Sequence, residues 1–184
     1  MSGQEMSDPE FGVIVIERTD HGRTVRVWGE AIPTASITRT GGAQMRGDVP
    51  IGTRNPRLLH LELGGRTYDL APAAGRLTRR SYRATVSGHG HQWLFVPAAG
   101  RSHRLLRDEH DQSAVELGVF TAGRATIAAQ WLRPPEAGRP PDEHPGSTGA
   151  DCAMGYVLAV SFGTNARGML MAVFAGTVDI LIPG

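Results

Sequence analysis

The sequence predicts a mainly β protein, an antiparallel meander that closes into a barrel or roll and carries an apolar helical segment at its C-terminus. Between Phe11 and Trp131, short apolar and β-branched runs alternate with polar residues and are separated by glycine-containing turns. No segment of this stretch has an apolar stripe at helical spacing. After Cys152 charges almost disappear, and only Arg167 and Asp179 interrupt the apolar tail. These three observations favour a sheet that surrounds a helix.

Composition excludes several classes of protein. The 184 residues include 19 basic side chains, all of them arginine, and 18 acidic ones, so that the formal net charge is +1. This balance argues against an extended nucleic-acid-binding face, which needs a clear excess of positive charge. A single cysteine, Cys152, excludes an intrachain disulfide framework and a cysteine-built zinc site. The length fits one domain.

The N-terminal segment, residues 1–10, is polar and acidic. It has neither the basic start nor the apolar centre of a signal peptide. We therefore expect this segment to be a short disordered tip. We also expect the protein to lie in the cytoplasm, either free or at the periphery of a membrane.

The body, residues 11–132, is expected to consist of β hairpins. The predicted strand pairs are Phe11–Arg18 with Thr24–Trp28, Leu59–Leu63 with Arg66–Leu70, Tyr82–Val86 with Gln92–Val96, and Ala114–Phe120 with Ala125–Trp131. Turn residues such as Asp20-His21-Gly22 and Gly64-Gly65 lie between the strands of a pair.

An internal repeat supports this organisation. Residues 68–79 match residues 93–104 at an offset of 25, and both copies contain the turn sequence Pro-Ala-Ala-Gly. One hairpin of this kind cannot bury its apolar face alone, so the repeat predicts neighbouring hairpins that close a sheet.

The remaining segments are a linker and a tail. Residues 133–149 contain five prolines and predict an extended, solvated connection. Residues 150–184 predict a helical element that packs with the body, so that the chain is one domain overall. Each apolar piece of the tail is shorter than the ~20 residues that a membrane-spanning helix needs.

A meander of hairpins around an apolar C-terminal helix resembles the tubby C-terminal-like superfamily, which includes the LURP-one-related and scramblase-like proteins. The residues that carry the resemblance are the strands of SYRATVSGHGHQWLFV, the strand–turn–strand step in RLLRDEHDQSAVELG, and the apolar finish after Asp151. The resemblance covers roughly residues 58 to 182. It implies lipid-facing or scaffold roles and supplies no catalytic residue.

Arginines recur after each Pro-Ala-Ala-Gly turn and predict an arginine-lined face of the sheet. The candidate binding residues are Arg76, Arg79, Arg80, Arg83, Arg101, Arg104 and Arg107. Guanidinium groups bind phosphate and carboxylate groups through two parallel hydrogen bonds. We therefore expect a non-enzymatic binding or scaffold module without a cofactor, whose partner is an anionic membrane surface or another protein. No nucleic-acid partner is expected.

The alternative is a small metal-dependent enzyme. His89 and His91 stand two residues apart, as neighbours on one face of a strand do, and His103 follows where the return strand of a hairpin belongs. The His-x-His pattern resembles that of cupins, although the glutamate that normally follows is missing. A polar hairpin turn explains the same residues without any metal.

Overall fold

The computed structural model describes residues 3–41, 46–75, 82–99, 101–108, 114–123, 126–132 and 146–163. Within these residues the chain forms eleven strands and one α-helix. In chain order these elements are β1 (Gln4–Asp8), β2 (Gly12–Thr19), β3 (Thr24–Gly29), β4 (Ala35–Arg39), β5 (Leu59–Leu63), β6 (Arg66–Pro72), β7 (Ala84–Gly88), β8 (His91–Pro97), β9 (Ser102–Asp108), β10 (Val115–Ala122), β11 (Ile127–Trp131) and α1 (Gly149–Phe162). Two short 3-10 turns, η1 (Asp20–Gly22) and η2 (Pro56–Leu58), lie between strands.

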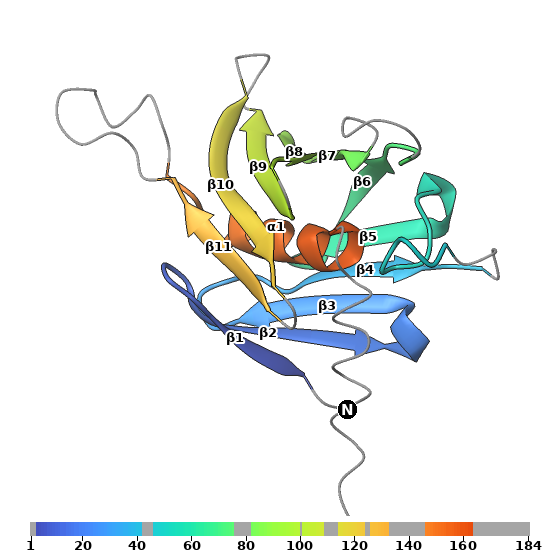
Figure 1. The fold of residues 1–184 in the computed structure, drawn as a ribbon, viewed down its shortest axis with the longest axis horizontal. Helices are drawn as coiled ribbons and strands as arrows, with labels where there is room; N and C mark the ends of the chain where they lie inside the picture. The colour runs from blue at the N-terminus through green and yellow to red at the C-terminus, as the bar shows by residue number, and fades with distance from the viewer. Residues whose placement is uncertain are drawn as a thin grey trace, which may run out of the picture.

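The strands form one antiparallel meander in which each strand pairs with its neighbours in the sequence. Figure 1 shows how this sheet curls around α1, with β1, β2 and β3 below the helix and β8, β9 and β10 above it. The first and last strands meet at a seam, where the Ile127 amide donates to the Met6 sulfur at 3.5 Å. The predicted fold class, a meander that closes into a barrel with a C-terminal helix, is confirmed.

α1 fills the interior of this nearly closed barrel. Every residue from Asp151 to Phe162 is buried, as expected for a helix that is apolar on all sides. Its first turn is held by a capping box in which Thr148 and Asp151 bind each other's backbone amides. At Gly155, a Cβ would lie 2.0 Å from the Phe120 ring, so only glycine allows the helix and β10 to approach this closely.

Parts of the predicted linker and tail lie outside the described residues. Residues 133–145 of the linker and residues 164–184 of the tail belong to these parts. The predicted helix is confirmed for Gly149–Phe162, and it begins one residue before the predicted element.

Two strands, β1 and β4, are absent from the sequence prediction, and a third, β9, lies outside the predicted strand pairs and was expected only from the strand–turn–strand resemblance. The expectation of a disordered tip over residues 1–10 is wrong for Gln4–Asp8, which forms β1 and pairs with β2. β4 pairs with β3 on one side and with β5 on the other. β1 and β4 each place a charged residue, Asp8 or Arg39, at a buried inward position. This charge interrupts the alternation of apolar and polar residues that normally identifies a strand.

The internal repeat corresponds to β6 and β8 with the turns that follow them. Tyr68 and Trp93, the first residues of the two copies, are both buried, and their ring centroids lie 5.6 Å apart in an edge-to-face arrangement. Pro72 and Pro97 end the two strands. The two copies therefore supply equivalent aromatic side chains to one wall of the core.

Candidate functional site

The buried carboxylates of the barrel lie around the N-terminal half of α1. Asp8 of β1 accepts a hydrogen bond from the Tyr156 hydroxyl at 2.9 Å. Asp151 accepts one from Trp93 Nε1 at 2.7 Å and one from Nη1 of Arg107. Both carboxylates therefore have donors, and the positive end of the helix dipole favours their charge.

Arginine side chains surround the C-terminal turn of the same helix. Arg18 Nη2 donates to the Val160 carbonyl at 2.9 Å, and Arg54 Nη2 donates to the Phe162 carbonyl at 3.5 Å. These bonds satisfy carbonyl groups that the end of a helix leaves without partners, and they place positive charge at the negative end of the dipole. Burial lowers the pKa of both arginines to about 10, which leaves them charged at neutral pH.

Arg39 is a third arginine near this end of the barrel, and its situation differs. It ends β4 at an inward position and is only 5% exposed. Within the described residues its guanidinium makes no hydrogen bond or ion pair, and its Nε atom is buried. Gly52 packs against it so closely that a Cβ there would lie 3.2 Å from Arg39 Nε. A buried charge without a partner is costly, which singles out Arg39 among the charges of the core.

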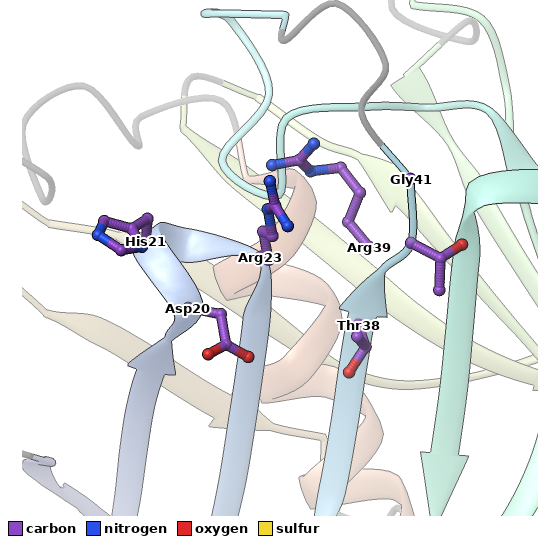
Figure 2. A pocket seen from close by; sticks show the side chains of 7 residues that line it. Asp20, His21, Arg23, Thr38, Arg39 and Gly41 are labelled. Atoms are coloured by element: carbon purple, nitrogen blue, oxygen red, sulfur yellow. The ribbon is translucent and has the colours of Figure 1, made fainter.

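Arg39 lines a cleft of about 540 Å³. The residues that line this cleft, named here the Arg39 cleft, are Asp20, His21, Arg23, Thr38, Arg39, Thr40 and Gly41. In Figure 2 the side chains of Arg23 and Arg39 come from the neighbouring strands β3 and β4 and lie at the same end of these strands. Their backbones are adjacent, since the Arg39 amide donates to the Arg23 carbonyl at 2.7 Å. Because Arg39 is buried and Arg23 is exposed, the cleft has an inner and an outer cation.

Among the lining residues only Asp20 carries a carboxylate, and it pairs with neither arginine in the described structure. In Figure 2 its side chain points away from the two guanidinium groups. Asp20 and His21 form η1 with backbone φ angles of 53° and 57°, in the left-handed region that residues other than glycine seldom adopt. Such conformations cost energy and are concentrated at functional sites.

The chemistry of the Arg39 cleft follows from this arrangement. Two adjacent guanidinium groups without a carboxylate between them repel each other, and each offers a planar fork of donors. An anion that accepts hydrogen bonds from both would relieve the repulsion and neutralise the buried charge. The geometry is therefore suited to holding an anionic group.

The predicted arginine face does not lie on one side of the sheet. Arg83, Arg101 and Arg104 are exposed, and Arg104 forms an ion pair with Glu116 at 3.1 Å. The prediction is wrong for Arg107, which points into the barrel, is 5% exposed and pairs with Asp151. Its strand carries Arg104 outward and Arg107 inward, since residues three apart on a strand lie on opposite faces. The other predicted members, Arg76, Arg79 and Arg80, lie outside the described residues.

The three predicted metal ligands do not meet around one point. His89 lies in the turn between β7 and β8, with a φ angle of 53°. His91 begins β8 and stacks on the Trp93 ring at 5.4 Å. His103 pairs with Pro97 at the other end of the β8–β9 hairpin. His91 and His103 are thus separated by roughly 20 Å of extended strand.

His103 occupies an environment that excludes charge. It is 3% exposed and stacks parallel on the Phe95 ring, with the ring centroids 4.7 Å apart. Burial, and to a smaller degree the charge of Arg54, lowers the pKa of His103 to about 4. The imidazole is therefore neutral at physiological pH. Across the described part of the chain, no group of three or more His, Cys, Asp and Glu side chains is placed to hold a metal ion.

The sequence motifs did not identify the key residues of the Arg39 cleft. Arg39 and Arg23 belong to no repeat and lie far from the predicted arginine face. The available signal is the alternation in Ala35-Ser-Ile-Thr-Arg39, which places an arginine where the pattern demands an inward apolar residue.

Comparisons with protein-family models, with curated proteins and with solved structures found no match to this chain. The resemblance to the tubby C-terminal-like superfamily therefore stays a prediction. Among the residues that the structure describes, no helix combines the length and the apolar character needed to cross a bilayer.

Proposed function

We propose that this protein is a non-enzymatic binding module that holds an anionic group in the Arg39 cleft. The observation that carries the proposal is Arg39, a 5% exposed arginine whose buried Nε atom has no hydrogen-bond partner within the described residues and which lines the cleft. The anionic group belongs to a lipid headgroup or to an acidic partner, the two kinds of partner that the recurring arginines of the sequence predict.

Energetic reasoning supports a ligand over a purely structural role. Arg18 and Arg54 already donate to the carbonyl groups at the C-terminal end of α1. Arg39 makes no such bond, so the helix dipole does not account for it. Burying an ion without a partner costs several kcal/mol, and the neighbouring charge of Arg23 adds to that cost. Groups that destabilise the free protein in this way are commonly retained for function.

Thermal unfolding of the full chain, in chloride and in phosphate at equal ionic strength, tests the proposal. We expect phosphate to raise the Tm of the wild-type protein, because a ligand that binds only the native state stabilises it. The Arg39→Met variant keeps the aliphatic stem and loses the charge. Its Tm in chloride should equal or exceed that of the wild type, and phosphate should no longer raise it.

Two further variants complete this experiment. Arg83→Met removes an exposed arginine outside the Arg39 cleft and should keep the full response to phosphate. Arg23→Met removes the exposed cation of the cleft. Because this side chain is exposed, the substitution should leave folding intact and should weaken the rise in Tm that phosphate causes. An equal response of the wild type and both cleft variants would overturn the proposal, and so would the absence of any response in the wild type.

A further inference from the structure

Resting on this proposed function, we infer that the Arg39 cleft selects a terminal phosphate monoester over a phosphodiester or a carboxylate. Three properties of the cleft carry the inference: the number of its cations, the burial of Arg39 and the position of its carboxylate.

The two cations require a ligand with more charge and more acceptors than a carboxylate has. Arg23 and Arg39 together carry two positive charges, and each can donate two parallel hydrogen bonds. A carboxylate or a phosphodiester has a single negative charge and two free oxygens. A phosphate monoester has three terminal oxygens and a charge between about −1.5 and −2 at neutral pH. Only the monoester satisfies both forks and neutralises both charges.

The burial of the inner cation favours a terminal group. Arg39 is the buried cation, and Gly52 packs against it, since a Cβ at Gly52 would lie 3.2 Å from Nε. Arg23, by contrast, is exposed at the outer part of the cleft. A phosphodiester has two substituents, and one of them would have to pass the buried side of the cleft where Arg39 lies. A monoester has one substituent, which can leave past Arg23 toward the solvent.

The position of Asp20 agrees with an entering phosphate. Its carboxylate, the only one among the described residues that line the cleft, points away from the guanidinium groups in Figure 2. His21 is exposed beside it in η1. The charged and titratable groups that line the cleft are therefore Asp20, His21, Arg23 and Arg39.

Calorimetric titration of the full chain with glycerol 3-phosphate, dimethyl phosphate and acetate tests this selectivity. We expect the monoester to bind at least about tenfold more tightly than either of the other two, because it gains a second charge-assisted contact. The Arg23→Gln variant should reduce this ratio toward one while it keeps residual binding through Arg39. Equal affinity of the wild type for all three probes would overturn the selectivity and leave the proposed anion site standing. Failure of all three to bind would overturn both proposals.

The dependence of binding on pH provides a second readout. The second pKa of a phosphate monoester is about 6, so affinity should fall between about pH 7.5 and pH 5 as the ligand loses its second charge. A His21→Gln variant, which removes the imidazole from the described lining of the cleft, should keep this fall, and constant or rising affinity at low pH in this variant would contradict the inference.

Vesicles distinguish the two sources of a phosphate monoester. Phosphatidate carries a terminal phosphate, whereas phosphatidylglycerol carries a phosphodiester, and the two are compared at equal surface charge. Binding to phosphatidate vesicles that glycerol 3-phosphate displaces identifies a lipid source. Binding of glycerol 3-phosphate without binding to either vesicle identifies a soluble source, and both results support the monoester. Equal binding to both kinds of vesicle, unaffected by glycerol 3-phosphate, would overturn it.

Discussion

Arg39 and Arg107 show how the same side chain takes different roles at inward positions of a strand. Both are 5% exposed, and both end up inside the barrel. Arg107 meets the carboxylate of Asp151, so its charge is neutralised within the core. Arg39 meets no carboxylate among the described residues and faces the cleft that it lines. The first arginine therefore contributes to the fold, and the second is available to a ligand.

His103 predicts an acid sensitivity that a single substitution should remove. Its pKa lies at about 4 in the folded protein, against 6.5 when unperturbed. The unfolded chain thus binds a proton that the folded chain does not, and stability falls as the pH drops from about 6.5 to about 4. The loss is of order 3 kcal/mol.

Urea unfolding across this pH range measures the effect. The His103→Leu variant cannot take up the proton, so its free energy of unfolding should depend less on pH between about 4 and 6.5. His60→Leu is the matched control, since His60 is exposed and pairs with Glu62 at 3.1 Å. The same pH dependence in His103→Leu as in the wild type would show that this imidazole is not the group that titrates.

At the scale of elements, Asp8 joins three segments that are distant in the sequence. Its carboxylate accepts hydrogen bonds from Trp131 of β11 at 3.1 Å and from Tyr156 of α1 at 2.9 Å. It also accepts the amides of Glu10 and Phe11, both at 2.9 Å. Burial and the charge of Asp8 raise the pKa of the Tyr156 phenol, so it stays a donor at any physiological pH. One buried carboxylate thus holds the first strand, the last strand and the central helix together.

Replacing this carboxylate should open the seam of the barrel. Asp8→Asn keeps the shape of the side chain but turns an amide group toward donors, which should lower the free energy of unfolding by about 2–4 kcal/mol. Hydrogen exchange should accelerate in β1 and β11 more than in β6 and β7. Asp69→Asn, at an exposed position of β6, is the control and should change neither quantity. Uniform acceleration across the sheet would argue against a local role at the seam.

At the scale of the whole molecule, α1 serves as the core of the barrel. The inward residues of the sheet pack on a helix whose side chains are buried on every side, and they have no other apolar layer to cover them in the described structure. The charges follow the same plan, with carboxylates toward the N-terminal half of the helix and arginines at its C-terminal turn. The fold is therefore organised around the axis of one helix.

A chain that ends before α1 should consequently fail to fold. Residues 1–145 keep every strand but leave the interior empty, and we expect neither a cooperative urea transition nor resistance to proteolysis. Addition of a peptide that spans residues 146–163 should restore both properties in part. A truncated chain that unfolds cooperatively by itself would show that the sheet has a sufficient core without the helix.

Most of the fold could be predicted from the sequence, because the residue patterns that specify a strand or a buried helix are local. The strands at Thr24–Trp28 and Leu59–Leu63 were predictable from alternating residues, and the buried helix from its uniform apolar character. β1 and β4 could not be predicted, because Asp8 and Arg39 stand at inward positions where a single sequence indicates exposure. The polarity of these two residues is explained only by their surroundings, which are four donors around the Asp8 carboxylate and a cleft beside Arg39.

For the candidate site, the sequence predicted the chemistry, which is the binding of an anionic group, but not the location. The arginines that recur after the repeated Pro-Ala-Ala-Gly turn indicated recognition of an anionic group, and that remains the proposed function. The sequence prediction placed the site between Arg76 and Arg107, because arginines recur at equivalent positions of the internal repeat there. The structure instead brings Arg23 and Arg39 together through the pairing of neighbouring strands.

The sequence by itself thus determined the meander and the helix within it, since the periodicity of apolar residues along the chain suffices for both. The tertiary structure alone decided which charges are neutralised and which are not. Pairing of a buried charge depends on partners from distant strands and from the helix, and no pattern along the chain records those distances. Arg107 finds Asp151 in this way, and Arg39 is left facing a cleft.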